Sequence, residues 1–202
     1  MRVDSIYSSS AIVFSSVGIV ATLYVVFVFI KHQETPVVRA SGRELCYVLL
    51  AGILMCYSMT FVLIMKPSNL VCGLQQTFIG LSFTIVYSAL LTKTMRISRI
   101  FNAGKKSAKR PSFISPKSQL TICTGMIFVQ LVIVIVWFAF SLPRAVHFYP
   151  TREDNQLTCE CIVNTSLFIG FCYPILLIIV CTIYAVLTRK IPEAFNESKY
   201  IG

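Results

Sequence analysis

Charged residues are scarce in this sequence, and their absence follows a pattern. Only 13% of the 202 residues are Asp, Glu, Lys or Arg, whereas soluble domains carry roughly a quarter. Charge is missing altogether from five long blocks, residues 11–30, 45–65, 73–92, 120–142 and 162–188. A helix needs about 20 apolar residues to cross a bilayer, and barrel strands are only about 10 residues with alternating polarity. The blocks therefore predict an all-α, polytopic membrane bundle of five helical spans.

Ionisable groups inside these blocks are also lacking, which excludes several kinds of site. The chain has two histidines, and neither His32 nor His147 lies in a span. An intramembrane enzyme needs a nucleophile with its base, or acid–base groups. A structural zinc site needs four ligands. These absences argue against an enzyme, a metal and a cofactor. A transporter or channel, which usually carries ionisable residues within its spans, is kept as a remote alternative.

A cleaved secretory signal peptide is an alternative interpretation of the first block, residues 11–30. Its apolar stretch is longer than the 7–15 residues typical of such signals, and Asp4 and the serines give it no positively charged leader. We therefore expect the block to remain as a membrane span.

Basic residues are distributed unevenly between the connecting segments. With the amino terminus outside, 14 of the 18 lysines and arginines fall in cytoplasmic segments, as the positive-inside rule requires. We therefore expect an extracellular amino terminus. The net charge of +10 is then a topological signal and no reason to expect nucleic-acid binding.

Three regions follow from this topology. Residues 1–10 are expected to form an extracellular stub, residues 11–188 the transmembrane bundle, and residues 189–202 a cytoplasmic tail. Apolar character returns at Tyr200 and Ile201, which suggests that a sixth span begins there.

Three of the eight cysteines lie outside the spans, on the side predicted to be extracellular. A disulfide between Cys72 and Cys159 would pin the second outer segment over the third span, with Cys161 as the alternative partner of Cys72. An oxidising compartment permits such a bond. Its closed loop of about 87 residues corresponds to about 4 kcal/mol of loop-closure entropy.

Several long strings of the sequence are characteristic of one family. They read TPVVRASGRELCYVLLAGI from residue 35, GLSFTIVYSALLTKTMRISRIF from residue 80, GKKSAKRPSFISPKSQL from residue 104 and CTIYAVLTRKIPEAFNESKYIG from residue 181. Together they resemble the transmembrane region of the metabotropic glutamate receptors, which are class C G-protein-coupled receptors. The resemblance covers nearly the whole chain from about Ser5 on.

This resemblance implies a seven-transmembrane class C receptor fold, of which the chain supplies five spans. It implies a plasma-membrane receptor whose extracellular domain, absent here, binds glutamate, and whose bundle signals to heterotrimeric G proteins. It also implies contact with membrane lipid and a receptor homodimer. We expect the chain to be a fragment of such a receptor. The alternative is a truncated, non-signalling form that pairs with full-length receptors.

The resemblance also assigns roles at the inner end of the third span. Lys93 matches a family lysine that pairs with the glutamate matched by Glu197, forming an inner ionic lock. Arg96 matches an arginine that contacts the first inner loop near Ser41. The alternative interpretation is that these basic residues anchor the helix at lipid headgroups.

Two further groups of residues take roles from the resemblance. Ile79, Phe83 and Tyr87 recur every four residues, so they share one helix face; packing between helices explains this equally well. The resemblance places Phe83 and Tyr87 in the wall of a small-molecule allosteric pocket, with Pro174 facing the same region. The loop after the third span is expected to contact the G protein through Ile100, Phe101, Lys105 and Lys106.

Overall fold

The computed structural model describes residues 6–36, 38, 42–106, 115–140, 142–151, 154–159 and 166–199. Its elements follow the order α1 (Ile6–Lys31), α3 (Arg43–Ile64), α4 (Asn69–Lys106), α5 (Pro116–Phe140), β1 (Ala145–Thr151), β2 (Asp154–Cys159) and α7 (Ser166–Lys199). Five of the helices in this described part are long and apolar enough to cross a membrane. The predicted fold class is therefore confirmed.

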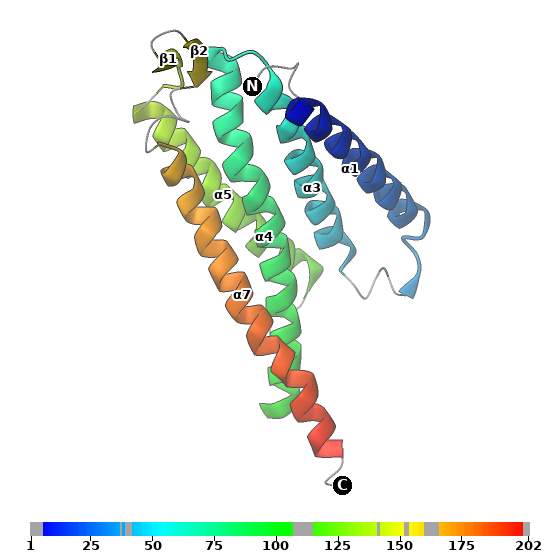
Figure 1. Ribbon diagram of the computed structural model, residues 1–202. Coiled ribbons are helices and arrows are strands. Elements are labelled where there is room, and N and C mark those ends of the chain that lie inside the picture. The colour runs from blue at the N-terminus through cyan, green and yellow to red at the C-terminus, as the bar shows by residue number, and fades with distance from the viewer. Residues whose placement is uncertain are drawn as a thin grey trace.

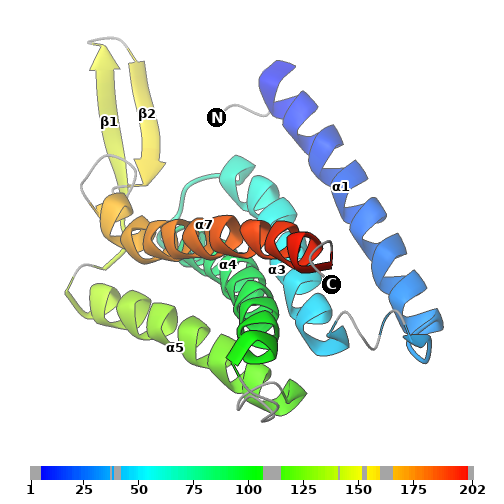
Figure 2. The same ribbon diagram turned by 90° about the horizontal axis from the view of Figure 1, so that it is seen from below.

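The helices form an elongated bundle organised around α4 (Figure 1). α4 contacts α3, α5 and α7, whereas α1 packs on α3 at one side. Seen along the bundle in Figure 2, α1 and α5 lie on opposite sides of α4. Each predicted span overlaps one of the five helices, although the membrane boundaries themselves remain predictions.

Two helices extend well beyond the predicted spans. α4 continues to Lys106, although residues 93–106 were expected to be loop. α7 continues to Lys199, so the region predicted as a tail, residues 189–202, is helical as far as Lys199. The expectation of a loop after residue 92 was wrong because a charged residue ends an apolar block without ending a helix. After Lys93, the next proline that could stop α4 is Pro111.

Buried residues of the bundle are mostly small or polar, and large apolar residues point outward. On α1, the buried residues Ser8, Ser15 and Thr22 recur every seven positions, while Phe14 is 78% exposed. Three of the four buried residues of α5 are Gln119, Cys123 and Gln130. This inverted pattern fits lipid as the solvent, where helices associate through small residues and hydrogen bonds.

Hydroxyl groups within the spans are satisfied by their own helix. On α4, Thr84 Oγ1 donates to the Gly80 carbonyl oxygen at 2.8 Å, and Thr92 Oγ1 donates to the Ser88 carbonyl oxygen at 2.8 Å. Such bonds to the preceding turn allow threonine to sit in an interior without water. The Ser88 hydroxyl also contacts Cys123 Sγ of α5 at 3.4 Å, so this face of α4 carries a polar contact between two helices.

Glycines bring the helix backbones close together. A Cβ added at Gly52 of α3 would lie 2.9 Å from methyl groups of both Ile85 and Val86. A Cβ added at Gly80 of α4 would collide with the Gln130 amide and lie 3.1 Å from the Gly170 carbonyl oxygen of α7. The close contacts of α3, α5 and α7 with α4 thus depend partly on glycine, which has no side chain to hold the helices apart.

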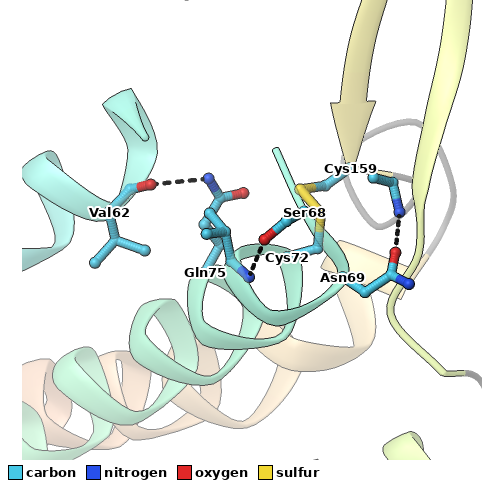
Figure 3. The surroundings of a disulfide bond; sticks show 8 residues. Val62, Ser68, Asn69, Cys72, Gln75 and Cys159 are labelled. Atoms are coloured by element: carbon cyan, nitrogen blue, oxygen red, sulfur yellow. Dashed lines mark hydrogen bonds between the residues drawn. A yellow bond between two sulfur atoms is a disulfide. The ribbon is translucent and has the colours of Figure 1, made fainter. Parts of the chain in front are cut away.

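The amino-terminal end of α4 holds a β-hairpin in place. β1 and β2 pair in antiparallel register from Ala145 opposite Cys159 to Thr151 opposite Asp154. A disulfide joins Cys72 in the first turn of α4 to Cys159 at the end of β2 (Figure 3). Of the two pairings considered for Cys72, the structure contains this one, and Cys161 lies outside the described residues.

Two hydrogen bonds complete this outer junction (Figure 3). The Ala145 backbone N–H donates to Asn69 Oδ1 at 3.0 Å, which joins β1 to α4. Gln75 Nε2 donates to the Val62 carbonyl oxygen at 3.1 Å, which joins α4 to α3. The hairpin was not predicted from sequence.

We predict that Cys72→Ser destabilises the bundle. Loss of a native bond that closes a loop of 87 residues should lower the free energy of unfolding by about 2–5 kcal/mol. Thermal unfolding of the chain in detergent measures the change. Cys172→Ser is the matched control because that free cysteine is exposed. Equal unfolding midpoints for the two variants would show that the crosslink does not stabilise the bundle.

We also predict that Gly80→Leu separates α5 from α4. The new side chain would overlap the Gln130 amide, and overpacking of this kind costs about 1–3 kcal/mol. Gly125→Leu makes the same chemical change at a site with no atom within 4 Å of the added Cβ. The unfolding midpoint should fall for Gly80→Leu alone. A similar fall in both variants would mean that the added leucine side chain itself, and not the close approach at Gly80, sets the effect.

Candidate functional site

Lys93 lies in the carboxy-terminal half of α4, away from the hairpin, and bonds to α3. Its Nζ donates to Cys46 Sγ at 3.1 Å, and Cys46 is 6% exposed. Cys46 belongs to the first turn of α3, so the contact ties that turn to α4. Cys46 lies within a predicted span, residues 45–65, and no functional role was predicted for it. A thiol is also a weak acceptor, but nothing in the sequence indicated which buried cysteine lies opposite Lys93.

The predicted lock partner of Lys93 is only partly described. Glu197 lies in the helical stretch of α7, but its side chain lies outside the part that the structure describes. The Lys93–Glu197 pair therefore stays a prediction.

Arg96 lies against the segment that leads into α3. Gly42 precedes α3 with φ 77°, a left-handed conformation that favours glycine. A Cβ added there would lie 3.1 Å from Arg96 Nη1. The arginine thus reaches the residue that follows Ser41. Ser41 itself lies outside the described residues, so its contact with Arg96 stays a prediction.

The predicted pocket residues lie mainly at the junction of α4 and α7. The Phe83 ring is 39% exposed and its centroid lies 6.1 Å from that of Phe171 on α7. Tyr87 packs against a buried cluster formed by Leu91, Leu177 and Cys181. Both contacts are helix packing, the alternative considered for this stripe.

The other two predicted pocket residues are placed as follows. Pro174 is fully buried on α7, and Ile79 is partly buried on α4. The structure thus brings Phe83 and Tyr87 to the α4–α7 junction, and their role in a small-molecule pocket stays a prediction.

Sequence reasoning missed a polar link between α5 and α7. Gln130 Nε2 donates to the Gly170 carbonyl oxygen at 3.3 Å, and Tyr173 Oη donates to the Met126 carbonyl oxygen at 3.0 Å. Gln130 is 0% exposed, and its Oε1 accepts no hydrogen bond within the described residues. The signal was present in the sequence, since a glutamine in an otherwise apolar span needs a partner.

The predicted G-protein contact residues are helical. Ile100, Phe101, Lys105 and Lys106 all belong to the last part of α4, so their assignment to a loop was wrong. Ile100 is 45% exposed, and the side chains of the other three lie outside the description. Their contact with a G protein stays a prediction.

Comparison with known proteins places this arrangement in a family. Residues 1–202 match the family described as "7 transmembrane sweet-taste receptor of 3 GCPR". The chain is 48% identical over its whole length to the metabotropic glutamate receptor of Drosophila melanogaster, of which it covers 21%. It is 47% identical, again over its whole length, to the probable metabotropic glutamate receptor mgl-1 of Caenorhabditis elegans, of which it covers 20%.

A human relative gives the same result. The chain is 48% identical over 192 residues to metabotropic glutamate receptor 8 of Homo sapiens, with 92% of this chain and 21% of the relative covered. The chain therefore spans about a fifth of the length of these curated relatives. The family is a class of receptors and not of enzymes. The chain belongs to the class C G-protein-coupled receptors, as a multi-pass membrane protein corresponding to the transmembrane region of the metabotropic glutamate receptors.

Proposed function

We propose that this chain forms part of the transducing bundle of a plasma-membrane receptor that responds to extracellular glutamate through heterotrimeric G proteins. The observation that carries the proposal is identity of 48% over the whole chain to a metabotropic glutamate receptor. Because the chain covers 21% of that relative, glutamate binding is assigned to a domain outside the matched region. Association of two receptors follows from the same relationship.

Two independent features support an extracellular amino terminus. In this orientation, 14 of the 18 lysines and arginines lie in cytoplasmic segments, as the positive-inside rule requires. The Cys72–Cys159 disulfide (Figure 3) lies at the amino-terminal end of α4, whereas Lys93 lies 21 residues further along the same helix, and such bonds persist in oxidising compartments. Both features support an orientation with the hairpin outside and the end of α4 that carries Lys93 inside.

Continuity of α4 supports a transducing role. One helix of 38 residues, about 57 Å long, connects the crosslinked hairpin to the basic inner end. Along this length α4 contacts α3, α5 and α7. A rearrangement imposed on the outer junction would therefore reach Lys93 and Arg96 through one rigid element.

A receptor chimera tests this proposal. We expect a Drosophila metabotropic glutamate receptor whose matching segment is replaced by these 202 residues to retain glutamate-stimulated guanine-nucleotide exchange. Its ligand domain is fused at the amino terminus, so a response to external glutamate also requires that end to be outside. The matched control is the same chimera with Lys105→Ala and Lys106→Ala, which should lower exchange if this end of α4 contacts the G protein.

Two outcomes would count against the proposal. A chimera that reaches the cell surface and binds glutamate but evokes no exchange would contradict the transducing role. If the chain alone also co-precipitates with an intact receptor and alters its trafficking, the pairing alternative would explain the protein better.

For Lys93 we propose the resting-state contact of an inner lock with Glu197. In the chimera, Lys93→Ala should raise glutamate-independent exchange roughly fivefold or more, the range of typical coupling energies, because a contact of the resting state is lost. Glu197→Ala should act in the same direction, and the charge swap Lys93→Glu with Glu197→Lys should restore low basal activity. Lys117→Ala is the control, since that lysine is exposed at the same end.

The structure adds a competing partner to this experiment, because Lys93 contacts Cys46. If Cys46→Ala reproduces the effect of Lys93→Ala and Glu197→Ala does not, the resting contact is the thiol and the Glu197 pairing is wrong.

A further inference from the structure

Two nucleophilic side chains, those of Lys93 and Cys46, are held in contact with each other. Lys93 Nζ lies 3.1 Å from Cys46 Sγ, and atoms positioned to react with one another lie about 3–3.5 Å apart. The two residues come from different helices, since Cys46 belongs to the first turn of α3 and Lys93 belongs to α4. The fold therefore holds an amine and a thiol at a separation from which a covalent bond between them can form.

The surroundings of the Cys46 sulfur decide what it can meet. The thiol is not part of a disulfide, the side chain is only 6% exposed, and Lys93 is partly buried against it. This burial keeps the thiols of other proteins away from the sulfur. Hydrogen peroxide is little larger than water and reaches such a site when the structure opens locally. An oxidised Cys46 therefore meets the Lys93 amine before it meets a thiol from another molecule.

We propose that hydrogen peroxide converts this contact into a reversible crosslink between Cys46 and Lys93, a sulfenamide. Oxidised cysteine, as the sulfenic acid, condenses with a thiol or with a backbone nitrogen, and here the Lys93 amine takes the place of that nitrogen. The link joins the first turn of α3 to α4. The proposed orientation puts this contact at the cytoplasmic side, where redox changes of cysteine are usually transient and serve in sensing.

Two steps form the link. In the first, the thiolate sulfur of Cys46 attacks hydrogen peroxide, the O–O bond breaks and an S–O bond forms. The released hydroxide takes the proton of the thiol and leaves as water, and the two electrons lost by sulfur reduce the peroxide. In the second, Lys93 releases one proton to solvent and its amine attacks the sulfur. An S–N bond then replaces the S–O bond, and the hydroxyl leaves as water with a second proton from the nitrogen.

A thiol reductant reverses the link. The sulfur of the reductant attacks Cys46 Sγ, the S–N bond breaks, and the amine leaves with a proton. A second thiol then releases Cys46 from the mixed disulfide. Sulfinic and sulfonic acids are not recovered by thiols, so recovery by a reductant separates the crosslink from further oxidation of the sulfur.

Peptide mass spectrometry of the 202-residue chain in nanodiscs tests the crosslink. After treatment with hydrogen peroxide and digestion, we expect a joined pair of peptides that contains Cys46 and Lys93. Its mass should equal the sum of the two peptides less two hydrogen atoms, and dithiothreitol should separate the pair. A chain unfolded in sodium dodecyl sulfate before oxidation should give no joined pair, because the contact belongs to the fold.

Matched variants test the two partners. Cys46→Ser and Lys93→Arg should each abolish the joined pair, since the first lacks the oxidisable sulfur and the second carries a guanidinium that stays protonated. Cys172→Ser removes an exposed free cysteine and Lys117→Arg changes an exposed lysine of α5, so both should retain the pair. Thermal unfolding reports whether each variant is folded. The chain without substitutions gives the deciding spectrum even where a variant does not fold.

Two results would overturn the proposal. Dimedone traps sulfenic acids, and its attachment to Cys46 without any joined pair would show that the amine does not capture the oxidised sulfur. Oxidation of Cys172 while Cys46 stays reduced would show that burial keeps peroxide from the site.

The crosslink would also affect signalling, a consequence that rests on the proposed function. A lysine nitrogen bonded to sulfur loses its positive charge and can no longer pair with Glu197. In the chimera, peroxide should therefore raise glutamate-independent exchange, and Cys46→Ser should abolish that rise. If the joined peptides form but exchange does not change, the crosslink stands and the inner lock is wrong. If no joined peptides form, the signalling role is unaffected and the crosslink is wrong.

Discussion

Everything in this bundle depends on how side chains from three helices fit against α4 without help from water. In lipid, apolar surfaces gain little by meeting one another, so close approach and hydrogen bonds hold helices together. The structure shows both. Gly52 and Gly80 let neighbouring backbones approach, and Gln130 bonds to the carbonyl oxygen of Gly170 across two helices. Large apolar residues such as Phe14, 78% exposed, face the lipid instead.

The same constraint organises the two ends of α4. At the outer end, Asn69, Cys72 and Gln75 bind the hairpin and α3 within two turns. At the inner end, Lys93 and Arg96 reach the first turn of α3 and the glycine before it. α4 is thereby fastened to its neighbours near both ends of its predicted span, residues 73–92, where charged and hydrogen-bonding groups are least costly.

The sequence alone was enough to predict the coarse fold, because a charge-free block of about 20 residues can form few structures other than a membrane-spanning helix. The ends of the helices were harder to predict from the sequence. The apolar block that ends at residue 92 predicts where the membrane span ends, but the helix α4 itself ends at Lys106. The hairpin was not predicted, since His147, Phe148 and Tyr149 form a short apolar run that is followed by proline.

The candidate site was likewise predicted only in part. The resemblance assigned roles to Lys93 and Arg96, but the residues that contact them depend on which turns of α3 and α4 lie side by side. That register, which includes the close approach of Gly52 to Ile85 and Val86, cannot be read from spacing within one helix. It brings Cys46, regarded as an ordinary buried residue, to 3.1 Å from Lys93.

The length of α4 has a mechanical consequence. A helix of 38 residues is about 57 Å long, whereas the hydrocarbon layer is about 30 Å thick. Its outer end is fixed to the hairpin by a covalent bond, which makes that end a pivot and the rest of α4 a lever arm. A tilt of only about 5° around Cys72 would move the far end by roughly 5 Å, the rise of one helical turn. A small angular change at one end of α4 can therefore become a displacement of several ångströms at the other end.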